Sequence, residues 1–340
     1  MKSIPLPTTL RGIIPPMVTP LSDQDALDVE GMERLIEHLI GGGVSGLFIL
    51  GTTGEGPSLG YSVRRELVVR ACRQVFGRVP VLVGITDSAP AESVRLGRFA
   101  ADVGAQGLVL APPFYFPQDQ DDFLEYTRAI VKQLPLPVFL YNMPTHTKLH
   151  LASETVRRLL DMPQIVGLKD SAPGAACFHE VRKWISRDRP EFSLLIGPEE
   201  LLSECMPLGA HGGVCGGANV FPSLFVDLYQ TCVRGEQARV AMLQDQVLRL
   251  ATTIYAVGNT SYAPIRTIKG ALACLGICGD RLASPLQSLS DLQRDQIRQT
   301  LADQQALPAG GVQRDAPARG ARRVFGQAAA GLSAAATGLR

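Results

Sequence analysis

The sequence predicts an α/β protein built as a (β/α)₈ barrel (a TIM barrel) with a helical region appended at its C-terminus. Two observations lead to this fold. Short, almost continuously apolar stretches, typical of parallel strands buried on both faces, alternate with stretches of helical periodicity. This strand–helix unit recurs eight times within about the first 220 residues. An open doubly wound sheet is the alternative, but such sheets usually have fewer strands.

The units can be followed in order along the chain. Strands are predicted at residues 12–20, 44–50, 79–85, 106–111, 137–141, 164–168, 192–196 and 212–215. Helices are predicted between them at 29–40, 63–76, 91–103, 121–133, 153–160, 175–185 and 199–208. The first helix ends at Gly41-Gly42-Gly43, a strong stop signal.

The pattern becomes wholly helical after Pro222, with helices predicted at 224–234, 237–257, 265–275 and 291–305. We therefore divide the chain into a barrel (1–222), a helical region packed on it and toward other subunits (223–307), and a tail (308–340). The tail is rich in Ala, Gly and Arg and has few large apolar residues, so we expect it to be disordered.

Composition excludes several classes of function. The net charge of +1 gives no reason to expect a nucleic acid or an anionic membrane as partner. The seven cysteines form no C-x-x-C pair and are typical of reduced thiols in a cytoplasmic protein. Cys274 and Cys278 could share a helix face, but no His or carboxylate nearby completes a metal site, so no metal is expected. No apolar run reaches the roughly 18 residues of a membrane span.

Lys169 is the residue around which the candidate site is organised. It ends the sixth predicted strand, in the segment Gly167-Leu168-Lys169-Asp170-Ser171. An interior lysine loses hydration, which favours the neutral amine, and a neutral amine can attack a ketone to form a Schiff base. The alternative is a lysine on the barrel rim, paired with Asp170.

Other polar side chains follow other predicted strands. Because the working residues of such barrels lie at the C-terminal ends of the strands, the candidates are Thr52, Thr53, Tyr115, Tyr141, Glu199 and Glu200. Each taken alone could be structural: a tyrosine that packs, a threonine in a turn, a glutamate in the first turn of a helix. Together with Lys169 they supply an amine nucleophile, two phenols able to move protons, and hydroxyl donors.

Three segments resemble, in order and spacing, the dihydrodipicolinate synthase and N-acetylneuraminate lyase family of pyruvate-dependent Schiff-base aldolases. They are Gly51-Thr52-Thr53-Gly54-Glu55, Tyr141-Asn142-Met143-Pro144 and Gly167-Leu168-Lys169-Asp170, and the resemblance covers about residues 10–300. It implies that Lys169 forms the Schiff base with a keto acid and that Tyr141 transfers protons beside it. It also implies that Thr52 and Thr53 hold the carboxylate of the keto acid.

The resemblance further implies an assembly and a wall of the pocket. Tyr115, in Pro112-Pro113-Phe114-Tyr115, matches a family tyrosine that reaches across a subunit interface to complete a proton relay with Thr52. The family is typically a homotetramer, a dimer of dimers, and uses no cofactor. The glycine-rich loop around Val214 would form a small-residue wall of the keto-acid pocket.

Two departures from the family pattern bear on the substrate. The synthases carry an arginine two residues after the proline of the Y-N-x-P motif, whereas this chain has His146, followed by Lys148 in place of a usual glycine. Neutral imidazole cannot make the bidentate clamp of a guanidinium; alternatively, Lys148 supplies the cation or His146 only packs. Glu199 and Glu200 resemble the lyase side of the family, where acidic residues bind the hydroxyls of sugar acids.

The sequence therefore predicts a cytoplasmic, metal-independent Schiff-base lyase acting on a 2-keto-3-deoxy sugar acid or a related 4-hydroxy-2-oxo acid. The first alternative is 4-hydroxy-tetrahydrodipicolinate synthase, which joins pyruvate to aspartate semialdehyde. A phosphate-binding barrel enzyme that uses the loop 212–217, and a barrel that binds keto acids without catalysis, are further alternatives. Cleavage, condensation and dehydration share the same imine and enamine, so the sequence does not separate them.

Overall fold

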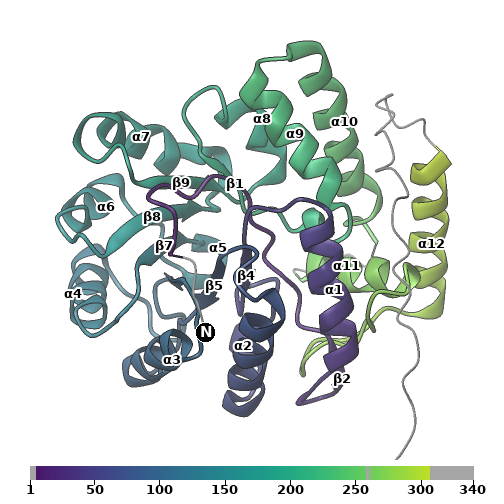
Figure 1. Cartoon of the computed structure of the whole chain (residues 1–340), viewed down its shortest axis with the longest axis horizontal. Helices are drawn as coiled ribbons and strands as arrows, with labels where there is room; N and C mark the ends of the chain where they lie inside the picture. The colour runs from purple at the N-terminus through teal and green to yellow at the C-terminus, as the bar shows by residue number, and fades with distance from the viewer. Residues whose placement is uncertain (1–4, 258–259, 261, 307–340) are drawn as a thin grey trace, which may run out of the picture.

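Eight parallel strands form a barrel in the computed structural model, which describes residues 5–257, 260 and 262–306 (Figure 1). The strands in sheet order are β1 (Gly12–Ile13), β10 (Gly212–Gly213), β9 (Ser193–Ile196), β8 (Ile165–Asp170), β7 (Val138–Asn142), β6 (Gly107–Leu110), β5 (Val81–Gly84) and β4 (Leu47–Ile49). The chain from β1 onward also pairs with β4: Ser45 N–H donates to the Ile13 carbonyl at 2.8 Å, and Met17 N–H donates to the Phe48 carbonyl at 2.9 Å. The sheet thus closes on itself, and the predicted barrel is confirmed.

The predicted helices lie around and beside the barrel (Figure 1). Those around it are α1 (Val29–Gly41), α2 (Tyr61–Val75), α3 (Pro90–Asp102), α4 (Gln120–Val131), α6 (Ser153–Leu159), α7 (Ala176–Asp188), α8 (Leu202–Cys205) and α9 (Pro222–Arg234). The C-terminal region adds α10 (Gln237–Thr253), α11 (Ala263–Cys274) and α12 (Asp291–Ala306). None of the described helices is long and apolar enough to cross a membrane.

Four local features differ from the predicted elements. The strand predicted over residues 12–20 covers only Gly12–Ile13 (β1), because the prolines that follow have no N–H to donate to a ladder. The helix predicted over 199–208 is a 3₁₀ turn, η3 (Glu199–Leu201), followed by the short α8, because Pro207 has no N–H to continue the helix. A hairpin of β2 (Leu21–Asp23) and β3 (Ala26–Leu27) and the one-turn helix α5 (Pro144–Thr147) were not predicted. The division at residue 222 stays a prediction, and the tail 308–340 lies outside the described residues.

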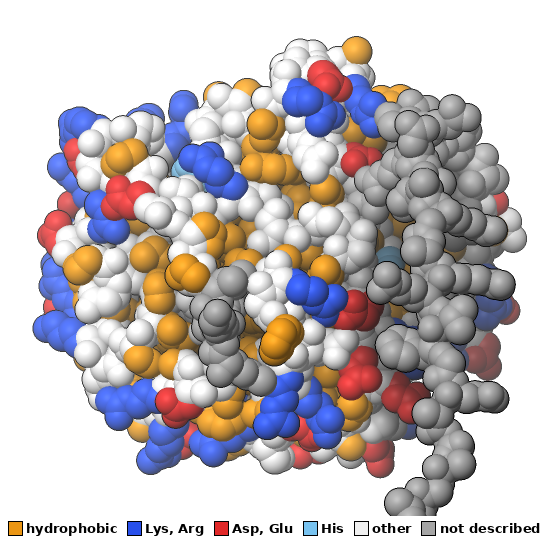
Figure 2. Space-filling view, in the orientation of Figure 1, with side chains coloured by type: hydrophobic (Ala, Val, Ile, Leu, Met, Phe, Trp, Pro, Cys, Tyr) orange, Lys and Arg blue, Asp and Glu red, His pale blue; other side chains and the backbone are white. Residues whose placement is uncertain are grey.

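The barrel interior is filled by its own apolar cluster, separate from the layer between strands and helices. Its buried members are Leu10, Ile14, Phe48, Leu82, Val109, Ala111, Phe139, Tyr141, Leu195 and Val214. Close packing also explains Gly167 in the lysine motif, because a Cβ there would lie 2.4 Å from Cδ1 of Phe139. On the face shown in Figure 2, basic and acidic side chains are interspersed around the periphery, and no large area of one sign stands out.

Candidate active site

Lys169 and Tyr141 lie side by side on neighbouring strands. In the β7–β8 ladder Tyr141 is the direct partner of Lys169, so their side chains leave the same face of the sheet. Both are buried, with 5% of Lys169 and 6% of Tyr141 exposed. Lys169 Nζ lies 4.0 Å from the centroid of the Tyr141 ring and 5.1 Å from that of Phe48. The amine is therefore held against two aromatic rings inside the barrel.

Asp170 is not the ion-pair partner of Lys169. One carboxylate oxygen accepts from Nδ2 of Asn142 at 2.9 Å and from the Ala172 N–H at 3.0 Å, and the other accepts from the Phe178 N–H at 2.9 Å. Within the described residues, no carboxylate lies within ion-pair distance of Lys169. The alternative of a rim lysine paired with Asp170 is therefore wrong. The supporting pair of Asn142 and Asp170 was not singled out from the sequence, although both belong to its motifs.

The phenol of Tyr141 has an altered acidity. Burial alone would raise its pKa, but the positive charge of Lys169 and hydrogen bonds to Thr52, Lys169 and Ser171 act against burial, and the net pKa is lowered from its usual value. The Tyr141 hydroxyl lies 3.4 Å from Oγ1 of Thr52. A phenol with a lowered pKa, beside an amine and a hydroxyl, is suited to take up and return protons.

Thr52 and Thr53 lie in the tight turn between β4 and α2. The Glu55 N–H donates to the Thr52 carbonyl at 3.0 Å and the Gly56 N–H donates to the Gly51 carbonyl at 3.1 Å. Gly54 is needed here because a Cβ would lie 2.8 Å from the Met17 carbonyl oxygen. Thr52 faces the cavity described next, whereas Thr53 is half-buried and is not among its lining residues.

A cavity of about 460 Å³ opens beside these residues. Its polar lining residues are Thr52, Glu55, Ser58, Thr86, Tyr141, Thr145, His146, Thr147 and Tyr262, of which Glu55 has its side chain buried away from the cavity. The two rings that flank the Lys169 amine, Phe48 and Tyr141, also line it. Tyr262, directly before α11, Ile265 within α11, and Leu286 beyond it come from the C-terminal helical region and were not predicted. The sequence carries no local signal for them, because they belong to no motif at a strand end.

His146 and Lys148 lie on and just after α5. His146 lines the cavity and its Nδ1 lies 3.0 Å from Oγ1 of Thr145. The pKa of His146 is lowered, mainly by partial burial. The charge of Lys169 lowers it further, and a hydrogen bond with the backbone of Thr145 acts in the opposite direction. Lys148 is exposed, does not line the cavity, and has a left-handed backbone with φ of 63°. This conformation accounts for glycine as the usual residue at the position.

Glu199 and Glu200 lie outside the lining of the cavity. The Glu199 carboxylate accepts from the Gly217 N–H at 2.5 Å and from the Tyr255 hydroxyl at 3.2 Å. Burial raises the pKa of Glu199 to about 7, against the effect of these hydrogen bonds. Glu200 is exposed. Val214 is buried in the interior cluster that contains Tyr141 and Phe48, and is likewise not a lining residue.

Tyr115 lies apart from the other candidates. Its side chain is 69% exposed and packs edge-on against Phe116, with the ring centroids 5.0 Å apart. In the part of the chain that the structure describes, it has no hydrogen bond to Thr52 or Tyr141. Its expected role in a relay needs a second copy of the chain and stays a prediction.

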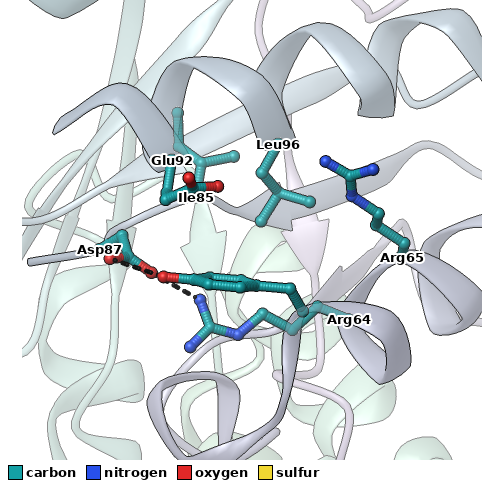
Figure 3. Close-up of a pocket in the computed structure, with 7 residues that line it drawn as sticks. Arg64, Arg65, Ile85, Asp87, Glu92 and Leu96 are labelled. Carbon is teal, nitrogen blue, oxygen red and sulfur yellow. Dashed lines mark hydrogen bonds and ion pairs between the residues drawn. The ribbon is translucent and has the colours of Figure 1, made fainter. Parts of the chain in front are cut away.

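A second, much smaller cavity lies between α2 and α3 (Figure 3). There Arg64 donates to Asp87 at 2.9 Å, and the Tyr61 ring lies beside them. Its volume of about 10 Å³ is close to the space of a single water, so it does not compete as a substrate site. Among the described residues no group of three His, Cys, Asp or Glu could hold a metal ion, and all seven cysteines are free.

Similarity to known proteins covers the barrel and the C-terminal helices. The model of the Dihydrodipicolinate synthetase family matches residues 9–304. A 4-hydroxy-tetrahydrodipicolinate synthase from Phenylobacterium zucineum is 32% identical over 295 residues, covering 86% of this chain and 97% of the relative. A probable 2-dehydro-3-deoxy-D-pentonate aldolase from Escherichia coli is 34% identical over 302 residues, covering 87% of this chain and 98% of the relative.

The structure of a dihydrodipicolinate synthase from Bacteroides thetaiotaomicron superposes with a TM-score of 0.84 at 47% identity, covering 88% of this chain and all of the other. The names of these relatives divide between a synthase and an aldolase, so they identify a shared chemistry and leave the substrate open. Members of the family are pyruvate-dependent class I lyases and synthases. This chain belongs to the dihydrodipicolinate synthetase family and is a Schiff-base-forming lyase.

Proposed function

We propose that this chain cleaves a 2-keto-3-deoxy sugar acid, or a related 4-hydroxy-2-oxo acid, into pyruvate and an aldehyde through an imine on Lys169. The observation that carries the proposal is the pairing of one amine with one phenol, Lys169 with Tyr141. Tyr141 lines the 460 Å³ cavity, and Lys169, which is not itself a lining residue, lies directly against the Tyr141 ring. Lys169 Nζ lies 4.0 Å from the Tyr141 ring, and the Tyr141 hydroxyl is within 3.4 Å of Thr52. A nucleophile, a proton carrier and a hydroxyl are the groups that this reaction requires.

The steps follow from the chemistry of an imine. The neutral amine of Lys169 attacks C2 of the keto acid, and the C2 oxygen leaves as water. The protonated imine then accepts the electron pair of the C3–C4 bond when Tyr141 removes the proton of the C4 hydroxyl, so that an aldehyde departs and an enamine remains. Protonation of C3 and hydrolysis of the imine release pyruvate and restore the amine. Thr52 and Thr53 hold the substrate carboxylate with hydroxyl and backbone N–H groups.

The lining of the cavity supports a hydroxylated substrate over aspartate semialdehyde. A semialdehyde ends in a carboxylate, which needs a fixed cation, and none of the lining residues in the described chain is Lys or Arg. The lowered pKa of His146 keeps its imidazole neutral at pH 7. Ser58, Thr145 and Tyr262 instead offer hydroxyl groups. Contacts from Glu199 and Glu200 to the substrate remain a prediction.

The runner-up is condensation of pyruvate with aspartate semialdehyde. It is favoured by the structural relative that shares 47% of its sequence and is described as a dihydrodipicolinate synthase. In that case the carboxylate of the semialdehyde needs a cation. Lys148, which is exposed at the C-terminal end of α5, would have to move toward the cavity to supply it.

We further propose a cytoplasmic homotetramer in which Tyr115 completes the proton relay of a neighbouring subunit. The exposed aromatic pair of Tyr115 and Phe116 supports an interface at this position, because two large apolar rings are otherwise left in water. The seven free thiols support a reducing compartment.

Borohydride trapping tests the nucleophile. With pyruvate present, reduction should add a stable mass to the peptide that contains Lys169, and the Lys169→Met variant should not be labelled. Lys148→Met, which removes an exposed lysine, is the matched control and should be labelled like the wild type. An adduct on another residue would contradict the proposal. A panel of keto acids assayed for pyruvate release, beside the semialdehyde condensation, then decides the substrate.

A further inference from the structure

Glu55, in the turn that carries Thr52 and Thr53, has a strained backbone and a buried charge. Its φ of 56° and ψ of 23° lie in the left-handed region, which glycine adopts freely and a glutamate adopts only when its surroundings hold it. Its side chain is 0% exposed. Because the backbone of Glu55 is strained and its carboxylate is fully buried, we infer that contacts to the side chain hold the residue in place. The backbone of the turn then takes the position that these contacts dictate.

The groups that hold this carboxylate all come from the C-terminal region. One oxygen accepts from the Ala283 N–H at 2.7 Å. The other forms an ion pair with Nζ of Lys269, a residue of α11 whose side chain is also 0% exposed. Lys269 in turn donates to the Arg281 carbonyl at 2.7 Å. Figure 1 shows α11 between the barrel and α12, where it can link the two.

The ion pair is connected to the candidate site by short steps. The Glu55 N–H donates to the Thr52 carbonyl at 3.0 Å, and Oγ1 of Thr52 lies 3.4 Å from the Tyr141 hydroxyl. A shift of the Glu55 side chain would therefore rotate the turn and move Thr52 relative to Tyr141. Lys169 and Tyr141 are on strands of the barrel, whose ladder holds their backbones, and Tyr141 meets this route only through its hydroxyl at Thr52.

We infer that Glu55 and Lys269 are positioning residues: their buried ion pair ties the Thr52–Thr53 turn to α11 and sets how well that turn binds the carboxylate of the keto acid. The inference rests on the proposed function, in which this turn receives the carboxylate. It makes the C-terminal helical region part of the active site, since Lys269 of α11 holds the turn through Glu55, while Tyr262, directly before α11, and Ile265, within it, line the cavity.

The experiment must separate positioning from stability. Removing one member of a buried ion pair leaves the other charge uncompensated, which destabilises strongly, whereas removing both charges is often neutral. We therefore choose Glu55→Gln, Lys269→Met and the double variant that combines them. The double variant leaves no uncompensated charge at the buried site, but it has no ion pair between the turn and α11. Thermal unfolding measures stability, and the rate of borohydride trapping as a function of pyruvate concentration measures binding and imine formation separately.

Each variant should raise the half-saturating pyruvate concentration about 10–100-fold, the effect expected for displacing a binding group by about 1 Å. The trapping rate at saturating pyruvate should change less than about threefold, because Lys169 and Tyr141 keep their places on β8 and β7. The double variant should regain the melting temperature that Lys269→Met loses while its half-saturating concentration stays raised. A structural role alone would restore both together.

Arg294→Met is the matched control. It breaks the 2.7 Å ion pairs of Arg294 with Asp280 and with Asp291 in the same C-terminal region, and among the described residues none of these three hydrogen-bonds to the turn. Its half-saturating pyruvate concentration should equal that of the wild type. A wild-type value in the double variant would overturn this inference alone. A wild type that forms no adduct on Lys169 would overturn the proposed function and the inference with it.

Discussion

Glu199→Gln tests whether Glu199 is a buried structural acid or a substrate ligand. Its carboxylate is held by the Gly217 N–H and the Tyr255 hydroxyl, and Glu199 is not among the residues that line the 460 Å³ cavity. Burial raises its pKa from 4.5 to about 7. A glutamine has nearly the same shape, can accept from the Gly217 N–H with its amide oxygen, and never carries the charge that burial penalises.

The sign and size of the effect follow from the pKa. Between about pH 4.5 and pH 7, folded Glu199 keeps a proton that the unfolded chain has released, so the free energy of unfolding falls as pH rises through this window. Below the window the stability is fully present, and above it the loss is complete and constant. The shift from 4.5 to about 7, at about 1.4 kcal/mol per unit, amounts to roughly 3 kcal/mol. The variant has no such loss.

Urea unfolding of the wild type and the variant at pH 4.5 and pH 8 measures this difference. On going from pH 4.5 to pH 8, Glu199→Gln should gain about 3 kcal/mol of stability relative to the wild type. Glu200→Gln, which alters an exposed neighbour, is the control and should show no comparable gain. A stability difference that does not change with pH would refute the reasoning. A large loss of kcat/KM with a sugar acid would instead support Glu199 as a ligand.

Three further substitutions address the chemistry, the substrate and the backbone. Tyr141→Phe should lower kcat about 10²–10⁴-fold in a pyruvate-release assay, while circular dichroism stays that of the wild type; near-normal turnover would show that another group moves the proton. His146→Arg should shift the kcat/KM ratio toward aspartate semialdehyde by about 10–100-fold, because it adds a charged bidentate donor; an unchanged ratio in side-by-side assays would count against the substrate argument. Lys148→Gly should raise stability by about 1 kcal/mol in urea unfolding, because glycine adopts the φ of 63° without strain; a lower stability would mean that the lysine makes a contact that stabilises the fold.

The sequence predicts the barrel well because its signals are local. Each of the eight strands is a short apolar run, and such a run is recognised without knowledge of its neighbours. The hairpin of β2 and β3 was missed because its strands are two or three residues long and carry little hydrophobic pattern. The helix predicted over 199–208 is too long because the apolar spacing continues up to Leu208, past Pro207, which has no N–H to continue a helix.

The parts of the site that could be predicted are those with a local sequence signal, and the parts that could not be predicted depend on contacts between distant residues. Lys169, Tyr141 and Thr52 each belong to a motif at the end of a strand, and the barrel topology alone brings such ends together. The contact of Glu55 with Ala283 joins residues 228 positions apart, and no local pattern indicates it. Glu55 belongs to the segment Gly51–Glu55, but nothing in that segment indicates its partner, since a glutamate in a loop is ordinarily a solvated charge.

The alternation of side chains along β8 explains why an acidic residue can follow the reactive lysine directly. Successive residues of a strand point to opposite faces, so Lys169 faces the barrel interior with Tyr141 while Asp170 lies on the other face with Asn142. A carboxylate on the inner face would hold the amine in its charged form and oppose attack on a ketone. On the outer face, the same carboxylate binds Asn142 of β7 and the N–H groups of Ala172 and Phe178, and so fixes the end of the strand that carries the lysine. Lys169 thus supplies the amine, and the adjacent Asp170 fixes the strand end that carries it. The polar neighbour of the amine is the phenol of Tyr141.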